Sequence, residues 1–352
     1  MNKILPLQSL RGILCMIVVL VHYTPYKDFT LHNHYLAGIS VIGFFLLSGY
    51  VLTLNYISKL DSLKSFFFFI KKRFLRLYPL HFFFLSIFLF LELIKYYSIS
   101  FFDLSLNSQA FKENNSETFL YNLFLLNSLA KYLSYNIPSW AVSAEFISSV
   151  IFGLLVLIFR SKLIIFSVIF FLCSWFIFLT QNISFISYLG PTAILSCLSC
   201  YFLGSLIFFT NNCKNIIILC NNFFLQFVNF TILIILICYK TNTSIIIFNI
   251  SILMLFLINI DQKSFFYNLL TNQYLVFLGT ISYSIYLSHY FVYYFVTQIF
   301  RYILKIESTD SYSNLAPSYM IYLLKLLLCV SITILLSKFT FKIIENKFRI
   351  KY

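Results

Sequence analysis

Long apolar runs recur along the whole of this 352-residue chain, and they limit its fold more than any other feature. A helix needs about 17 to 25 apolar residues to cross a bilayer, which is roughly the length of these runs. The composition agrees, because 61% of the residues are hydrophobic and only 10% are charged, whereas about a quarter are charged in soluble domains. We predict an all-α polytopic membrane bundle of about ten helices, near residues 8–26, 36–57, 79–97, 138–159, 163–180, 186–209, 216–238, 244–260, 274–300 and 319–341.

The spans and their loops use up the length of the chain, so residues 1–352 are predicted to form a single membrane domain. The first run does not resemble a cleaved signal peptide, because Arg11 interrupts it and no small-x-small cleavage site follows. The most polar segment is 98–118. The apolar run 119–133 that follows is short, which suits an interfacial or re-entrant segment.

The distribution of basic residues predicts the orientation of the bundle. With the N-terminus inside, the inner segments hold sixteen lysines and arginines and the outer segments hold seven. Cytoplasmic loops carry such an excess, so both termini are expected on the cytoplasmic side. The net charge of +14 therefore indicates topology and contact with anionic lipids rather than nucleic-acid binding.

Cysteines and loop histidines do not predict a metal site. The eight cysteines lie mostly in apolar runs, and Cys197-Leu-Ser-Cys200 lacks a second pair or a nearby histidine. His32 and His34 supply only two ligand-type residues. Other motifs suit structural roles: Ser48-Gly49 favours close helix packing. Glu92 and Lys325, near the outer ends of spans, are expected to snorkel, and His81 is expected at the inner interface.

One arginine and one histidine interrupt the first apolar run. Ionisable groups are costly inside a bilayer and indicate a functional site by default. Arg11 and His22 are eleven residues apart, which places both on one helix face, about 16 Å apart along the axis. A cation near the inner face and an imidazole deeper in the membrane suit a long anionic ligand. The alternative is an interfacial arginine and a polar histidine packed within a bundle.

Two more arginines, Arg73 and Arg76, are spaced to share a helix face before the third span. Arginine forks bind phosphate groups with paired hydrogen bonds. With Arg11 and Lys72, these residues are candidates for a phosphate-binding mouth on the inner side. The alternative is the basic character that inner loops have in any case.

Polar side chains also lie inside later spans. Glu145 is about two turns inside the fourth span, at the depth predicted for His22, where a carboxylate would fix the histidine tautomer. The alternative is a structural hydrogen bond to a neighbouring helix. Ser282, Tyr286 and His289 recur at helical spacing as one polar stripe, which either lines a pocket or satisfies other buried groups.

Five short motifs occur in order along the chain: Leu10-Arg11-Gly12 followed by His22, Phe44-Phe45-Leu-Leu-Ser48-Gly49-Tyr50, Arg73-Phe-Leu-Arg76-Leu-Tyr78-Pro79, Trp140 through Glu145, and Gly279 through His289. Each is weak alone. In this order and on a frame of ten spans, they resemble the acyltransferase family 3 of integral membrane proteins, which includes bacterial O-antigen and exopolysaccharide O-acetyltransferases. The resemblance covers nearly the whole chain.

The chain departs from the family pattern in two places. Ala141 replaces the serine that usually follows the tryptophan, and Ile42-Gly43 stand where a polar residue is often found. Neither change removes a proposed catalytic group, but both bear on acceptor preference. Some members carry an extracytoplasmic esterase-like domain after the last span, and we expect this chain, which ends at Tyr352, to lack it.

The resemblance implies an acyltransferase of the bacterial inner membrane. Such a protein would move an acyl group, acetyl in the first instance, from cytoplasmic acyl-coenzyme A to a hydroxyl of an envelope or exported saccharide or glycolipid. Acetyl-CoA is then a donor substrate, and no permanently bound cofactor is expected. Arg11, Arg73 and Arg76 would hold the coenzyme A phosphates.

The same resemblance assigns the chemistry to His22, as general base or as acyl acceptor. Glu145 would orient His22 and stabilise its charged form. Weaker candidates for lining the site are Ser143, Trp140, Tyr283 and His289.

The sequence leaves open two functions other than acyl transfer. A secondary transporter also buries a few ionisable groups among many spans, although no matching halves occur here. A saccharide flippase would not consume acetyl-CoA. Within the enzyme class, the sequence leaves open succinyl or longer acyl donors, the acceptor and the oligomeric state.

Overall fold

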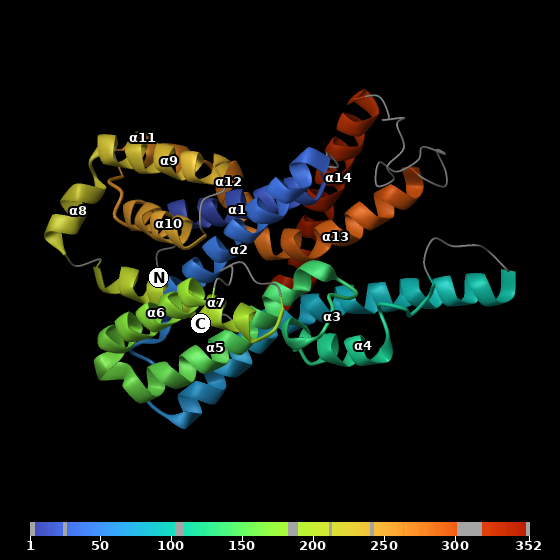
Figure 1. Ribbon diagram of the computed structural model, residues 1–352, viewed down its shortest axis with the longest axis horizontal. Helices are drawn as coiled ribbons and strands as arrows, with labels where there is room; N and C mark the ends of the chain where they lie inside the picture. Colours follow the sequence, from blue (N-terminus) through green and yellow to red (C-terminus); the bar gives the residue numbers. More distant parts are fainter. Residues whose placement is uncertain are drawn as a thin grey trace.

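The computed structural model describes residues 4–23, 27–102, 109–181, 189–210, 213–239, 243–262, 264–300 and 319–349. Of these residues, 86% are helical, and none lies in a strand (Figure 1). The predicted all-α fold is therefore confirmed.

Short turns connect most of the helices along the chain. Single 3₁₀ turns occur at Asn127–Leu129, Ile137–Ser139 and Arg160–Lys162, and a π-helical turn occurs at Phe341–Glu345. The helices are α1 (Leu5–Tyr23), α2 (Lys27–Tyr56), α3 (Leu63–Phe102), α4 (Ser116–Leu123), α5 (Trp140–Phe159), α6 (Leu163–Thr180), α7 (Pro191–Thr210), α8 (Lys214–Cys220), α9 (Phe223–Cys238), α10 (Thr243–Ile258), α11 (Phe265–Leu270), α12 (Gln273–Thr280), α13 (Ser282–Gln298), α14 (Tyr319–Thr340) and α15 (Asn346–Phe348).

Most of the apolar runs marked in the sequence coincide with one helix, whereas 216–238 is divided between α8 and α9, and 274–300 between the bent pair α12 and α13. By length and hydropathy, six helical stretches in the described ranges are able to cross a membrane, and the bent pair makes a seventh. One of the six, Ile137–Thr180, contains both α5 and α6, while α9 and α10 are shorter apolar helices. The protein is polytopic, and the count of ten spans stays a prediction.

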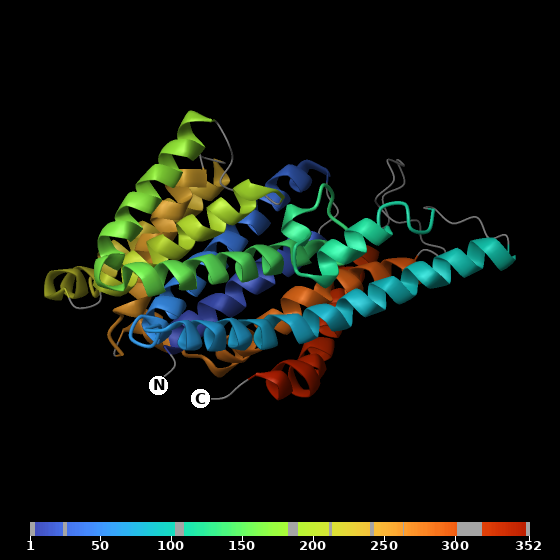
Figure 2. The ribbon, with the colours of Figure 1, turned by 90° about the horizontal axis from the view of Figure 1, so that it is seen from below.

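Helix α2 lies in the middle of the bundle and packs against both α1 and α7 (Figures 1 and 2). Small residues permit the contact with α7. A Cβ added to Gly49 would overlap the backbone of Tyr201, and one added to Gly204 would overlap the backbone of Leu46. This close approach agrees with the packing role predicted for Ser48-Gly49.

Helices α12 and α13 meet at an angle of 71°. The break lies beside α1, where a Cβ on Gly12 would come within 2.7 Å of the Gly279 nitrogen. A Cβ on Gly279 would in turn overlap the backbone of Gln8. The two glycines thus let α1 and α12 touch backbone to backbone, which fixes where α13 starts relative to α1.

Residues 109–139, which we call the cap, connect α3 to α5 through α4 and two 3₁₀ turns. The buried carboxylate of Glu92 anchors the cap, because it accepts hydrogen bonds from the Phe111 nitrogen at 3.0 Å and from Asn114 at 2.7 Å. Lys95 donates to the same carboxylate at 2.5 Å. The prediction that Glu92 snorkels is therefore wrong, since the cap supplies partners that the linear pattern did not reveal.

The cap also enters the bundle. His81 of α3 is 1% exposed, and its Nε2 lies 2.8 Å from the carbonyl oxygen of Asn122, so it packs against the cap, while its predicted position at the inner interface stays a prediction. Leu125 and Ser128, within the run 119–133, are fully buried. Leu120, Phe124 and Tyr132 of the same run are exposed. Only one side of the run therefore packs against the bundle, and both the interfacial and the re-entrant alternatives stay open.

Candidate functional site

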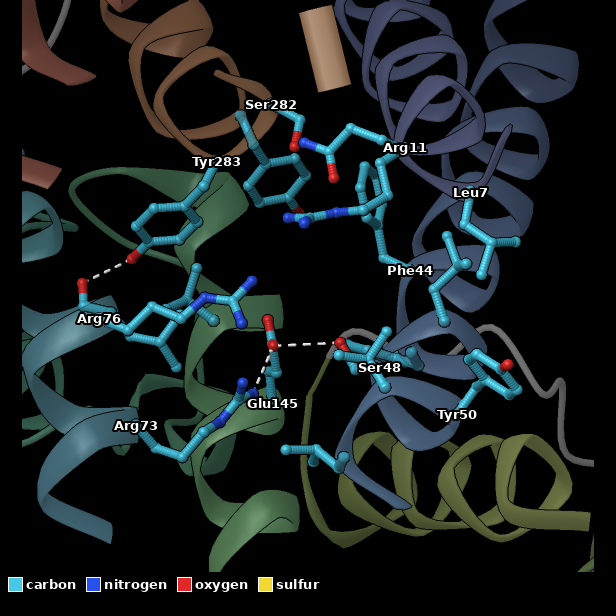
Figure 3. A pocket seen from close by; sticks show the side chains of 18 of the residues that line it. Leu7, Arg11, Phe44, Ser48, Tyr50, Arg73, Arg76, Glu145, Ser282 and Tyr283 are labelled. Atoms are coloured by element: carbon cyan, nitrogen blue, oxygen red, sulfur yellow. Dashed lines mark hydrogen bonds and ion pairs between the residues drawn. The ribbon is translucent and has the colours of Figure 1, made fainter. Parts of the chain in front are cut away.

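A cavity of about 270 Å³ lies between α1, α2, α3, α5 and α13 (Figure 3). Ile4 and Arg349 both line it, so the two ends of the described chain lie on one side of the bundle. That this side faces the cytoplasm stays a prediction. Most of the wall is apolar and includes Leu7, Val41 and Phe44.

Four arginines and one glutamate line this cavity and give its wall a formal charge of +3. Arg11 projects from α1, and Arg73 and Arg76 project from one face of α3 (Figure 3). Arg349 follows α15 at the C-terminal end. The structure thus brings together the three arginines that the sequence suggested as phosphate ligands and adds a fourth.

The glutamate is Glu145 of α5, and its partner is Arg73. The Arg73 Nη2 donates to the Glu145 Oε1 at 2.6 Å, and the Ser48 hydroxyl donates to the same oxygen at 3.2 Å (Figure 3). Glu145 therefore lies at the level of Arg11 and not at the depth of His22. The expected contact between Glu145 and His22 is wrong, because the buried guanidinium of Arg73 is the cation that this carboxylate compensates.

The other three guanidinium groups of the cavity, those of Arg11, Arg76 and Arg349, form no hydrogen bond or ion pair within the described ranges. The Nε of Arg76 is buried and unsatisfied. Burying a cation without a partner is costly, and each guanidinium presents five donors in a planar fork. The wall is therefore suited to an anion with several oxygens, such as a phosphate ester.

Two residues expected to line the site lie behind its wall. The Ser143 hydroxyl donates to the Leu125 carbonyl oxygen at 2.7 Å and is 2.9 Å from the Ser128 hydroxyl, so it holds the cap. Trp140 is buried with its ring edge-on to Phe45, at 6.4 Å between centroids. The described cavity wall includes neither Ser143 nor Trp140.

Two tyrosines of α13 do line the cavity. The Tyr283 hydroxyl donates to the Leu77 carbonyl oxygen at 2.6 Å, and the Tyr286 hydroxyl donates to the Pro138 carbonyl oxygen at 3.0 Å. These bonds tie α13 to α3 and to the cap. The predicted position of Tyr283 agrees with its place in the wall (Figure 3).

His22 of α1 and His289 of α13 lie against each other, with ring centroids 5.0 Å apart. The Nδ1 of His22 is 2.8 Å from the Val18 carbonyl oxygen, and the Nδ1 of His289 is 2.7 Å from the Tyr286 carbonyl oxygen. A carbonyl oxygen only accepts hydrogen bonds, so in both neutral rings the proton is assigned to Nδ1 and Nε2 is basic. Backbone carbonyls, and not Glu145, set the tautomer of His22.

Aromatic rings separate this histidine pair from the cavity. Tyr286 lines the cavity, and its ring centroid is 5.8 Å from that of His289 and 6.3 Å from that of Phe44. Neither His22 nor His289 belongs to the described cavity wall. The order along the bundle is therefore arginine cavity, Phe44 and Tyr286, and then the two imidazoles.

A comparison with models of protein families gives the general activity of the chain. The sequence model of an acyltransferase domain matches residues 6–338, which is nearly the whole chain. The chain belongs to acyltransferase family 3. No curated protein and no solved structure matches the chain significantly. As a family 3 acyltransferase with several apolar helices, the protein is a multi-pass membrane enzyme, which favours acyl transfer over the transporter and flippase alternatives.

Among basic residues, sequence reasoning missed one that lines the acyltransferase cavity and included one that the described wall lacks. Arg349 was counted only as a basic residue of the tail, because no periodicity or motif links a position after the last span to α1 and α3. Lys72 lies outside the wall, with its ammonium 4.5 Å from the ring centroid of Phe68. The side chains of His32 and His34 lie outside the described residues.

Proposed function

We propose that this membrane acyltransferase takes an acetyl group from cytoplasmic acetyl-CoA and transfers it to a hydroxyl of an envelope or exported saccharide. Its place would be the bacterial inner membrane, with the arginine cavity open to the cytoplasm. The observation that carries the proposal is the cluster of three guanidinium groups in one cavity, which have no partner in the described chain and lie one aromatic layer away from two imidazoles.

The donor matches this layout in charge and in length. Coenzyme A carries its phosphates at one end of a flexible arm and the acyl thioester at the other. Arg11, Arg76 and Arg349 would bind the phosphates with charge-assisted hydrogen bonds, and Arg73 would stay paired with Glu145. The arm would then run along α1, where Arg11 and His22 are about 16 Å apart on one face. Phe44 and Tyr286 would move aside to admit it.

His22 supplies the proton transfer in this proposal. Its Nε2 would take the proton of the acceptor hydroxyl while the hydroxyl oxygen bonds to the thioester carbon. When the carbon–sulfur bond breaks, the leaving thiolate would take the proton from Nε2, and His22 would return to its neutral form. Attack on the thioester by Nε2 itself, through an acyl-histidine, uses the same unprotonated nitrogen.

The first test is acetyl-CoA turnover by purified, detergent-solubilised protein with a crude envelope glycan as acceptor. We expect His22→Ala to lower kcat at least about 100-fold, since a positioned base contributes about 10²- to 10⁴-fold. Labelled acetyl groups should appear on the glycan with the wild type only.

Thermal unfolding and size-exclusion profiles of both proteins check that His22→Ala is folded. His22→Ala with wild-type turnover would overturn the role of His22. Absence of turnover by a folded wild type, with acetyl, succinyl and longer acyl donors and several glycans tried, would overturn the proposed donor and acceptor.

A further inference from the structure

A buried carboxylate lies near the C-terminal end of the bundle, where α14 passes into α15. Glu345 is 5% exposed and belongs to the π-helical turn Phe341–Glu345. The Ser284 hydroxyl of α13 donates a hydrogen bond to the Glu345 Oε2 at 2.9 Å. This bond joins the π-helical turn to α13, and the acyl transfer proposed above gives neither residue a role.

Glu345 does not pair directly with an arginine. Arg11, Arg76 and Arg349 are close enough to attract a carboxylate at this position, yet none of them forms an ion pair with it within the described ranges. A carboxylate paired with Arg349 would occupy donors that a phosphate group needs. Because Glu345 bonds to a neutral serine instead, it leaves these guanidinium groups available to the donor substrate.

The spacing of Glu345 and Arg349 links the contact with Ser284 to the cavity. Residues four apart lie on the same side of a helix, and the Arg349 N–H donates to the Glu345 carbonyl oxygen at 3.2 Å. Arg349 lines the cavity, and so does Tyr283, the residue before Ser284. Glu345 is therefore fixed to α13 next to the residue of α13 that lines the wall, one helical turn before Arg349.

The segment that carries Arg349 has little packing of its own. Helix α15 spans only Asn346–Phe348 and contains no buried residue, so Glu345 is the last buried residue of the described chain. A π-helical turn contains about one residue more than an α-helical turn, and it rotates the segment after it by about 100°. The position of Arg349 thus depends on this turn and on the bond that holds it.

We propose that Glu345 is a positioning residue that fixes the C-terminal segment to α13, so that Arg349 completes the phosphate-binding wall of the cavity. This inference rests on the proposed function, in which Arg349 binds a phosphate group of acetyl-CoA. Without the bond to Ser284, donor binding would have to order the segment that carries Arg349. The affinity for the donor would then fall, because ordering a segment on binding costs conformational entropy.

The test compares Glu345→Leu, which has no acceptor for Ser284, with Glu345→Gln, whose amide oxygen keeps one. We expect Glu345→Leu to raise the KM for acetyl-CoA about tenfold, and Glu345→Gln to stay within about twofold of the wild type. The kcat should change less than about twofold in both, since the histidine pair is untouched. Ser284→Ala removes the donor of the same bond and should raise the KM as Glu345→Leu does.

Two further variants separate positioning from a general structural role. Ser288→Ala removes a buried hydrogen bond of 2.9 Å between α13 and Ser337 of α14, and it should keep the wild-type KM. The double variant Glu345→Leu/Arg349→Ala should have the KM of Arg349→Ala alone, since Glu345 acts through Arg349. A further rise of the KM in the double variant would overturn the inference, and so would a KM of Glu345→Gln as high as that of Glu345→Leu.

Failure of this inference is distinct from failure of the proposed function. If Arg349→Ala raises the KM while folded Glu345→Leu and Ser284→Ala keep the wild-type value, only the role of Glu345 is wrong. If Arg349→Ala keeps the wild-type KM, phosphate binding by Arg349 is wrong and the inference fails with it. The rise in the unfolding temperature with free coenzyme A ranks the same variants without turnover. No such rise with the wild type would overturn the donor site itself.

Discussion

The guanidinium groups of Arg76 and Arg349 line the cavity without a partner in the described chain, which makes them the residues most sensitive to the donor. A hydrogen bond to a charged group contributes about 1.5–3 kcal/mol. We therefore expect Arg76→Ala or Arg349→Ala to raise the KM for acetyl-CoA about 10- to 100-fold, with kcat nearly unchanged. Initial-rate kinetics measure both quantities. Arg160→Ala is the matched control, because Arg160 is exposed and its side chain donates, within the described chain, only to the Ser58 carbonyl oxygen. A lower kcat with an unchanged KM would contradict phosphate binding.

Sequence spacing predicted part of this cavity at the level of single residues. Arg73 and Arg76 share a face because a helix repeats after about 3.6 residues. This periodicity applies whichever helices pack against α3. The depth of Glu145 was misjudged, since span boundaries are uncertain by several residues and each residue moves a side chain about 1.5 Å along the axis. Glu145 pairs with Arg73, and Arg349 lines the cavity, because of the way α3, α5 and α15 pack together. The sequence spacing does not record this packing.

The contact between α1 and α12 sets the position of both Arg11 and His22. A Cβ at Gly279 would overlap the Gln8 backbone, which cannot rotate away as a side chain does. We expect Gly279→Ala to destabilise the protein by about 1–3 kcal/mol and to lower kcat, because α1 must shift. Thermal unfolding in detergent and turnover of acetyl-CoA measure the two effects. Gly43→Ala is the control, since its Cβ would meet only the Leu14 side-chain end, at 2.8 Å. Equal stability of the two variants would contradict this account.

At the scale of elements, hydropathy located every long helix, because the apolar runs alone specify them. It did not predict the cap. Its contacts, such as Glu92 with Asn114 and Ser143 with Ser128, join polar residues distant in sequence, and no periodicity records them. Nor did it predict the bend of 71° between α12 and α13, which lies beside the contact of Gly279 with α1.

On the proposed function, the two parts of the molecule separate donor binding from chemistry. The arginine cavity lies on the side where the described chain starts and ends, and the histidine pair lies deeper, beyond Phe44 and Tyr286. An enzyme that links donor and acceptor on opposite sides of a bilayer needs such a division, because an open passage would leak ions. The aromatic layer is therefore the part through which the thioester would have to pass.

If the thioester passes through the aromatic layer, Phe44 should limit the length of the acyl group that the enzyme accepts. Its ring lines the cavity and lies 6.3 Å from the Tyr286 ring, so Phe44→Ala opens space where the acyl group would pass. One methylene in an apolar pocket changes selectivity by about 10- to 200-fold, so we expect the ratio of kcat/KM for hexanoyl-CoA over acetyl-CoA to rise at least about tenfold. Phe171→Ala, which empties similar volume within α6 beside Trp175, should leave the ratio unchanged. An unchanged ratio in a folded, active Phe44→Ala variant would show that the acyl group reaches His22 by another route.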